Sequence, residues 1–411
     1  MEDASLGRMP ASAGRIQSLD VLRGVALLSI AVANVPSFAS VAAARINPVV
    51  YGSLEGANWW AWLVSYVLFD GRFTAIYGMT FGAGLVILAE RYERAGVRVA
   101  RLHLRRMAAL LALGLLHAYL LWYEDFLVAL ALCGTLAYLY RRIEPRRLII
   151  LGIVIMAVGA AAPLDVAWRM PGWSPEKMRH VQQKWSPPAE ALTREIDAYR
   201  SGWLGQMSHR VPMAFDRQTR GFVSRPLWQM TGLMVIGMAL FKNNVFNATR
   251  STRFYGILTL GGFGLGIPLV LFAIHENFAA GWALRRFLIL DGLANYWSGF
   301  LVGLGWVGLV MLACRHVRHL GAFAAVGRLS LTNYLFQSVL FTAIFYGHGL
   351  GLFARVERAG QLAVAVGVAA FEIVTSLLWT RYFSVGPVEW AWRSLSLGRR
   401  VSARAPSAKA T

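Results

Sequence analysis

The chain has 411 residues, of which 57% are hydrophobic and 15% charged, and its mean hydropathy is +0.49. Soluble globular proteins carry about 25% charged residues, so this composition excludes an ordinary soluble domain. It predicts an all-α, polytopic transmembrane helix bundle. The formal net charge of +20 does not indicate a nucleic-acid partner, because the cations fall in short clusters between apolar runs.

About ten apolar runs approach the roughly 20 residues that a bilayer crossing needs. The first is expected to remain as an uncleaved span, because no small-residue cleavage site follows it. The second is too long for one helix, and Asp70-Gly71-Arg72 is predicted to break it into an interfacial piece and a spanning piece. The runs cover 18–38, 59–90, 102–121, 123–140, 146–163, 226–242, 253–275, 290–314, 328–346 and 359–382.

The distribution of Lys and Arg predicts the orientation. With the N-terminus inside, the inside segments hold 24 of these cations and the short outside segments hold 5. Cytoplasmic loops carry this excess in membrane proteins. We therefore predict that both termini are cytoplasmic and that membrane lipids are partners, and we leave the oligomeric state open.

One segment between the apolar runs is large enough to form a separate extracytoplasmic piece. Apolar residues recur in it at helical spacing, which predicts a helix on the membrane surface that is either a lid or acceptor-binding element or a packed connecting helix. These residues are Leu192, Ile196, Tyr199, Trp203 and Leu204. The predicted organisation is an N-terminal transmembrane half (1–163), this segment (164–225), a C-terminal transmembrane half (226–398) and a disordered tail (399–411).

Polar residues inside the first apolar run mark a candidate site, because polar groups at membrane depth are costly and usually functional or paired. Arg23 and Asn34 are eleven residues apart, which places them on one stripe of a helix that turns about 100° per residue. The alternative is that Asp20 and Arg23 pair with each other and merely anchor the helix end.

His117 and Asp125 form a second candidate. They lie eight residues apart across a predicted tight reversal, at the same predicted depth as Asn34. An imidazole–carboxylate pair orients a general base and raises its basicity. The alternative is a structural histidine that joins two helices. Neither the histidines nor the cysteines show metal-ligand spacing, so no metal is predicted.

Three further polar groups occur in the last two runs. Asn333 and Gln337 are spaced to hydrogen-bond neighbouring helices, and a structural role is favoured for them. Glu372 lies in mid-run, where we expect it to pair with Arg23 or Arg72 or to line a watery cavity.

Arg105 and Arg106 crowd one predicted cytoplasmic helix end. Such arginines serve topology and lipid headgroups, or they bind an anionic cofactor such as the phosphates of coenzyme A.

Five blocks of sequence, in this order, resemble the bacterial YeiB family of multi-pass inner-membrane proteins. The C-terminal half of that family is a domain of unknown function. The resemblance spans nearly the whole chain except 164–225 and the tail, and it implies a location in the bacterial cytoplasmic membrane. The blocks lie at 15–35, 70–84, 105–127, 327–353 and 383–398.

The first helix also resembles a wider transmembrane acyltransferase superfamily, which includes the O-antigen acyltransferases and the heparan acetyltransferase. This resemblance implies transfer from cytoplasmic acyl-CoA to an acceptor across the membrane. The O-antigen branch has an arginine and, eleven residues later, a catalytic histidine. Arg23 matches the arginine, but Asn34 stands where the histidine would be.

The resulting hypothesis is an acyltransferase-like membrane enzyme. Acyl-CoA would approach near Arg23 and the Arg105–Arg106 end, and His117 with Asp125 would deprotonate an extracytoplasmic acceptor, with Asn34 donating a hydrogen bond. One alternative is a transporter or flippase of a small amphiphile, without covalent chemistry, whose substrate path is formed by buried polar groups: Arg23, Asn333, Gln337 and Glu372. Another is a non-catalytic partner of a membrane complex.

Overall fold

The computed structural model describes residues 16–96, 98–398 and 400–403. Within these residues the chain folds into helices and contains no strand, which confirms the all-α helix bundle. Of the predicted tail, residues 399 and 404–411 lie outside the described residues, as do residues 1–15. The described part of the tail contacts the bundle, since the amide of Ser384 donates to the carbonyl of Ala403 at 3.0 Å.

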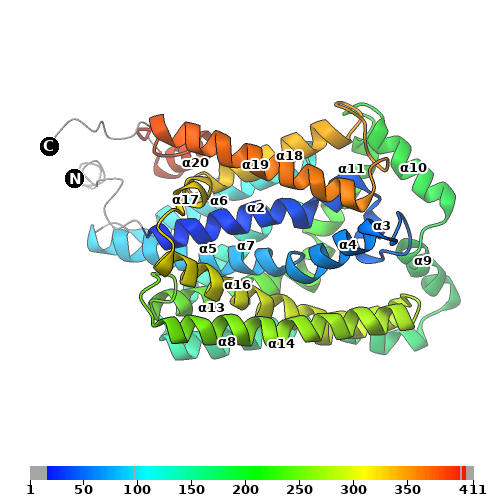
Figure 1. Cartoon of the computed structure of the whole chain (residues 1–411), viewed down its shortest axis with the longest axis horizontal. Helices are drawn as coiled ribbons and strands as arrows, with labels where there is room; N and C mark the ends of the chain where they lie inside the picture. The colour runs from blue at the N-terminus through cyan, green and yellow to red at the C-terminus, as the bar shows by residue number, and fades with distance from the viewer. Residues whose placement is uncertain (1–15, 97, 399, 404–411) are drawn as a thin grey trace.

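The longest helices lie side by side along the long axis of the molecule (Figure 1). Six helical stretches of the described chain are long and apolar enough to cross a membrane, which confirms a multi-pass membrane protein. They are α2 (Gln17–Ala39), α4 with α5 (Ala57–Leu68 and Arg72–Arg94), α8 (Pro145–Arg169, continued by a 3-10 turn, Met170–Gly172), α14 (Thr252–Ala279), α15 with α16 (Leu284–Leu290 and Tyr296–His316, joined by a π turn, Asp291–Asn295) and α19 (Arg358–Tyr382).

The other four predicted runs also correspond to helices, three of which are short. They are α6 (Val99–Leu120), α7 (Leu127–Ala137, followed by a 3-10 turn, Tyr138–Tyr140), α13 (Pro226–Lys242) and α18 (Ser330–Phe345). The ten-span topology and the cytoplasmic placement of both termini stay predictions. Helix α2 begins near the end of the bundle where α20 (Pro387–Leu397) and α17 (Gly321–Arg328) lie (Figure 1).

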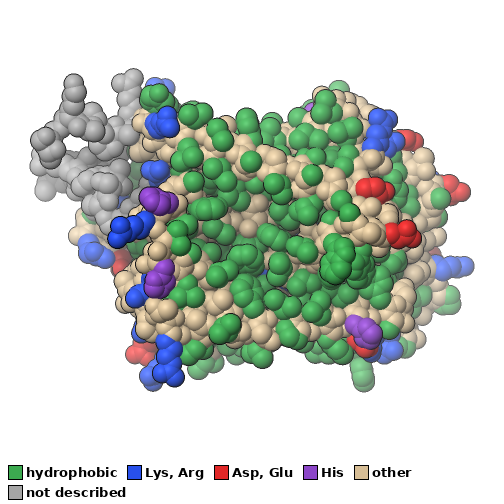
Figure 2. Space-filling view, viewed as in Figure 1, with side chains coloured by type: hydrophobic (Ala, Val, Ile, Leu, Met, Phe, Trp, Pro, Cys, Tyr) green, Lys and Arg blue, Asp and Glu red, His purple; other side chains and the backbone are tan. Residues whose placement is uncertain are grey.

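The surface has the polarity that a bilayer requires. Figure 2 shows hydrophobic side chains over the middle of one face and charged side chains gathered toward its two ends. Large apolar side chains point outward from the long helices; Ile150 on α8 and Leu260 on α14 are 65% and 75% exposed. Lipid tails solvate such side chains, whereas water would not.

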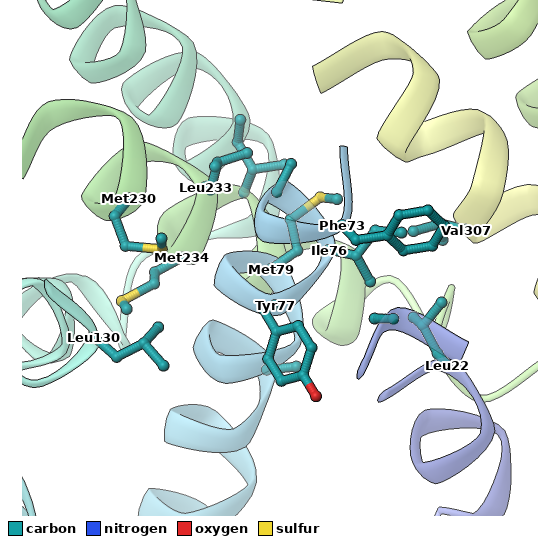
Figure 3. Close-up of a cluster of buried hydrophobic side chains, with 14 of the residues drawn as sticks. Leu22, Phe73, Ile76, Tyr77, Met79, Leu130, Met230, Leu233, Met234 and Val307 are labelled. Atoms are coloured by element: carbon teal, nitrogen blue, oxygen red, sulfur yellow. The ribbon is translucent and has the colours of Figure 1, made fainter. Parts of the chain in front are cut away.

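Helix α5 lies at the centre of the core. Its side chains Phe73, Ile76 and Met79 meet residues from neighbouring helices, including Leu22 of α2 and Met234 of α13 (Figure 3). The predicted break before α5 is confirmed.

The break is made by Gly71, which adopts a left-handed conformation with φ of 73° that glycine reaches without a steric penalty.

The 164–225 segment covers the end of the bundle remote from α20 (Figure 1). It forms α9 (Pro175–Trp185), α10 (Ala189–Arg200), α11 (Met207–Gln218) and α12 (Arg220–Ser224), next to α3 (Ala42–Ile46). Tyr199 is buried, which favours a packed connecting helix over a membrane-surface helix. The predicted helix was too long, because Ser201 is extended, with φ of −71° and ψ of 173°, and leaves Trp203 and Leu204 outside α10.

Candidate functional site

A cavity of about 330 Å³ lies at the end of the bundle where α2 begins and α20 packs against α6. All five of its arginines are half-buried, so the cavity reaches the protein surface. Two carboxylates, Asp20 and Glu389, also line it, so five arginines and two carboxylates are present among the described lining residues. The arginines are Arg23, Arg91, Arg106, Arg328 and Arg393.

The inner part of this arginine-lined cavity is apolar. Leucines from α5, α6 and α7 line it, and it ends at Phe126 and Tyr334. Charged side chains at the mouth and hydrocarbon inside suit an anionic headgroup that carries an apolar chain. The leucines include Leu85, Leu110 and Leu130.

Arg23 is held at the cavity wall by its neighbours. Its guanidinium donates to the carbonyl of Thr80 at 3.2 Å and lies 3.9 Å from the carboxylate of Asp20. The local pairing of Asp20 with Arg23 is therefore present near the start of α2, and both residues line the cavity.

The predicted Arg105–Arg106 pair divides into two environments. The guanidinium of Arg106 lies 4.1 Å from the ring centroid of Trp392 and lines the cavity. Arg105 is exposed and is not among the cavity residues. Only Arg106 of the two is thus placed to meet a ligand in the cavity.

His117 lies beyond the inner end of the cavity, in a buried polar cluster. Its Nδ1 is 2.7 Å from Oδ2 of Asp125, so the predicted contact is present. Its Nε2 is 2.8 Å from the hydroxyl of Ser338. An ionised carboxylate only accepts hydrogen bonds, so with Asp125 ionised Nδ1 donates to it and Nε2 can accept from Ser338. The Ser338 hydroxyl also lies 3.4 Å from the carbonyl of Tyr334, to which it can donate instead. Histidine, carboxylate and hydroxyl are 2%, 6% and 1% exposed, respectively.

The reversal between α6 and α7 brings the carboxylate to the histidine. The other oxygen of Asp125 accepts from the amide of Val128 at 2.8 Å, which fixes it at the start of α7. Gly114 makes this close approach possible, because a Cβ there would lie 2.7 Å from the amide nitrogen of Val128 and 3.0 Å from Asp125.

Aromatic rings separate His117 from both ends of the bundle. Tyr334, which lines the cavity, has its ring centroid 5.1 Å from the imidazole and 4.6 Å from Phe126. On the other side Trp122 lies 6.3 Å from the imidazole and stacks on Phe38 at 4.2 Å. A ligand in the cavity would therefore meet Tyr334 before the histidine.

A second polar cluster joins α18 to α19. The amide of Asn333 donates to Ser376 at 2.8 Å, and that of Gln337 donates to Glu372 at 2.7 Å. Glu372 is 0% exposed. The expectation that it pairs with an arginine is wrong for the described residues: its hydrogen-bond partner is Gln337, because this face of α19 meets α18.

Two other predicted residues lie away from both clusters. Arg72 is buried and donates to the carbonyls of Val67 and Asp70 at 3.2 and 2.6 Å, so it caps the end of α4. Asn34 is half-buried on α2. It is not among the hydrogen-bond partners of His117, whose two ring nitrogens are occupied by Asp125 and Ser338.

The 164–225 segment contacts the bundle through a buried carboxyl group. The amide of Ala42 donates to Glu195 at 2.8 Å, and burial raises the pKa of Glu195 to about 7. Burial also lowers the pKa of His209, whose Nε2 is 3.7 Å from the same carboxyl oxygen. These shifts oppose formation of an ion pair near neutral pH.

Several residues of the site were missed in the sequence, including the cavity arginines Arg328 and Arg393. Tyr334 and Ser338 are four residues apart on α18, so they share a face; the predicted pair Asn333–Gln337 lies one position away on the adjacent face. Their helical spacing was visible in the sequence, but burying a serine or tyrosine in a membrane costs too little free energy to mark the pair as a site. Glu389 accepts from the amides of Leu331 and Thr332 at 2.7 and 3.1 Å and so caps α18.

Comparison with known proteins identifies relatives over nearly the full length. The family described as "Protein of unknown function (DUF418)" matches residues 240–399. "Uncharacterized protein YeiB" of Escherichia coli (strain K12) is 30% identical over 395 residues, covering 92% of this chain and 96% of the relative. "Uncharacterized protein YxaH" of Bacillus subtilis (strain 168) is 30% identical over 412 residues, covering 92% and 94%.

A more distant relative, "Uncharacterized 39.9 kDa protein in amylase 3'region" of Bacillus acidopullulyticus, is 23% identical over 398 residues, covering 94% of this chain and 95% of the relative. The names of these relatives state no activity. The near-complete coverage at 30% identity, together with the helical bundle, leads to one conclusion: the chain belongs to the YeiB-like family of multi-pass membrane proteins.

Proposed function

We propose that this protein is a membrane acyltransferase of the bacterial cytoplasmic membrane that takes an acyl group from acyl-CoA and passes it to a hydroxyl acceptor. The observation that carries the proposal is the arginine-lined cavity, whose apolar interior ends one aromatic ring away from His117.

The charged and apolar parts of acyl-CoA correspond to the charged mouth and the apolar interior of the cavity. Arg23, Arg106 and the three other cavity arginines would bind the phosphates, because guanidinium groups form strong charge-assisted hydrogen bonds with phosphate. The leucine-lined interior would hold the pantetheine arm, with the thioester and the first carbons of the acyl chain at its inner end. The thioester would then approach Tyr334 and, behind it, His117.

His117 and Asp125 supply the proton transfer that acyl transfer needs. With Nδ1–H donating to Asp125, the Nε2 lone pair is available to take a hydroxyl proton, and the carboxylate stabilises the imidazolium that forms. General-base catalysis of this kind contributes about 10²- to 10⁴-fold to rate. The acceptor would enter from the end of the bundle that the 164–225 segment covers.

Binding of acetyl-CoA and of a long-chain acyl-CoA to detergent-purified protein, measured by calorimetry, tests the proposal. We expect micromolar binding that is tighter for the longer chain and at least tenfold weaker in Arg23→Ala. Arg179→Ala, which changes an exposed arginine on α9, is the control and should bind as the wild type does. Absence of binding to any acyl-CoA would contradict the proposal.

A second candidate function is transport or flipping of an anionic amphiphile without covalent chemistry. The observation that favours it is Glu372, whose Oε1 is buried without a hydrogen-bond partner among the described residues. Such a carboxyl group could carry a proton across a gradient. Flux of an amphiphile into proteoliposomes, driven by a proton gradient and lost in Glu372→Gln, would support this function.

A further inference from the structure

We infer that Ser338 is the acyl carrier: the acyl group is held as an ester on its hydroxyl between the departure of coenzyme A and the arrival of the acceptor. This inference rests on the proposed acyltransferase function and deepens it. Its basis is the buried series Ser338, His117 and Asp125, joined by hydrogen bonds of 2.8 and 2.7 Å.

The three side chains are arranged as a nucleophile, a base and an orienting carboxylate. The Asp125 carboxylate holds the imidazole in the tautomer whose Nε2 accepts from a hydroxyl, and the amide of Val128 holds the carboxylate. A serine hydroxyl is a weak nucleophile on its own and becomes effective when an adjacent base takes its proton. The arrangement is recognised by geometry, since Ser338 is 221 residues from His117 in sequence.

Ser338 also has the right position relative to the cavity. Tyr334 lines the cavity, and Ser338 follows it by one helical turn, so the two Cα atoms are about 6 Å apart along α18 at 1.5 Å per residue. Rotation of the Tyr334 side chain would open the path from the cavity to the serine. Rotamer changes of single side chains are fast compared with enzymatic turnover.

An unpaired donor lies beside the same histidine. The indole N–H of Trp122 is buried and has no acceptor among the described residues, and its ring is 6.3 Å from the imidazole. A buried donor without a partner costs about 1–3 kcal/mol, and a carbonyl oxygen that becomes negative during acyl transfer would satisfy it.

The step balances as two acyl exchanges. In the first, Oγ of Ser338 bonds to the thioester carbonyl carbon, the carbon–sulfur bond breaks, and the serine proton passes through Nε2 of His117 to the departing thiolate, which leaves as free coenzyme A. In the second, the acceptor oxygen bonds to the ester carbon, the bond to Oγ breaks, and His117 returns the acceptor proton to Ser338.

An acyl group held on Ser338 would let the donor and the acceptor reach His117 one after the other. The cavity opens at the arginine-lined end, whereas Trp122 and Phe38 close the opposite side of His117. A donor and an acceptor that arrive from opposite ends then need not occupy the site together. Each exchange requires only one of the two aromatic barriers to move.

The test uses the full-length protein in detergent with acetyl-CoA and no acceptor, followed by peptide mass spectrometry. We expect one acetyl group on the α18 peptide at Ser338, with release of one coenzyme A per protein in a burst. Ser338→Ala should lose both the label and at least 100-fold of the steady-state release seen with hydroxylamine as a small acceptor.

Ser338→Cys keeps a nucleophile and should give a thioester that neutral hydroxylamine removes. Ser376→Ala removes another buried serine hydroxyl, which accepts from Asn333 on the far side of α18, and should label as the wild type does. This pair of variants separates loss of the nucleophile from loss of a buried hydrogen bond.

Two results would overturn the inference while leaving the proposed function in place. One is turnover of acetyl-CoA with hydroxylamine by Ser338→Ala at the wild-type rate and no label on the wild-type protein. The other is an acetyl group on His117 instead of Ser338. If the wild-type protein neither binds acetyl-CoA nor releases coenzyme A, the proposed function fails and this inference fails with it.

Discussion

Two buried polar clusters lie on different faces of α18, and they differ in their surroundings. The His117 cluster includes Ser338 and borders, through Tyr334, on the arginine-lined cavity. The Glu372 cluster joins α18 to α19 through Gln337 and is not among the cavity residues. Both would be singled out in a sequence as costly polar groups at membrane depth.

The difference teaches that burial of a polar group does not by itself identify a catalytic site. The His117 cluster is a chain of donors and acceptors that ends in the Ser338 hydroxyl and lies beside the arginine-lined cavity. The Glu372 cluster is a hydrogen bond between neighbouring helices, of the kind that holds membrane helices together. Variants that affect one cluster and spare the other test this distinction.

Replacement of His117 should have the largest effect. We expect His117→Ala to lower acyl transfer by about 10²- to 10⁴-fold, because the general base is lost. Glu372→Gln keeps a group that can bond to Gln337 and should stay within about twofold of the wild type. Release of coenzyme A from acetyl-CoA, with hydroxylamine as acceptor, measures both. Equal loss in the two variants would contradict the distinction.

Gly114→Ala should disturb the His117 cluster without changing any of its polar groups. The new methyl group would press on Val128 and Asp125, and overpacking of this kind costs about 1–3 kcal/mol. We expect lower thermal stability together with lower transfer. Gly261→Ala in α14 has open space around its Cβ and serves as the control. Unchanged transfer in Gly114→Ala would show that the close approach is not needed.

Glu372→Ala should affect stability and not chemistry. It leaves the Gln337 amide with one fewer acceptor, although the carbonyl of Leu27 still accepts from it at 3.2 Å. Loss of a partner for a buried polar group costs about 1–3 kcal/mol. Thermal unfolding in detergent should detect this destabilisation, while transfer per folded molecule stays constant. A stable Glu372→Ala protein that has lost acyl transfer would contradict this assignment and would show that Glu372 takes part in the chemistry.

Neighbouring arginines give a smaller and more selective effect. Arg106→Ala should weaken acyl-CoA binding by about tenfold, equivalent to 1.4 kcal/mol, because Arg106 lines the cavity. Arg105→Ala changes the exposed neighbour and should bind with an unchanged Kd. Calorimetry at one ionic strength compares the two, and equal weakening would mean that general electrostatic attraction, not the cavity, binds the anion.

The smallest predicted effect concerns the 164–225 segment, which lies at the end of the bundle remote from the arginine-lined cavity. The pKa of Glu195 is raised to about 7 by burial. A raised carboxyl pKa contributes stability below the unfolded value, about 4.3, and this contribution is lost as the pH rises through about 7. We expect α10 amides to exchange several-fold faster at pH 8 than at pH 5 after correction for intrinsic rates. Glu195→Gln should remove the difference, and persistence of the difference would exclude Glu195 as its cause.

More of the fold than of the candidate site could be predicted from the sequence. Apolar periodicity located the helices, and Gly71 marked a break that was confirmed, because these are local properties of the chain. The His117–Asp125 contact was also within reach, since the two residues are only eight positions apart.

Contacts between distant segments could not be predicted in the same way. Ser338 meets His117 across 221 residues, and only the tertiary arrangement of the helices brings the two side chains together. Arg72 was predicted as a possible partner of Glu372, yet nearby backbone carbonyls take its donors. Sequence shows that a buried cation needs partners, but it does not show whether the backbone provides them.

Photoaffinity labelling with a long-chain acyl-CoA that carries a diazirine close to the thioester carbonyl would locate the reacting end of the acyl group directly. If the cavity leads the acyl chain toward His117, the label should fall on α18 near Tyr334 and on the facing parts of α6 and α7, and excess unlabelled acyl-CoA should prevent it. Labelling confined to the lipid-exposed surfaces of α8 and α14, or unaffected by competition, would contradict a cavity that supplies the histidine.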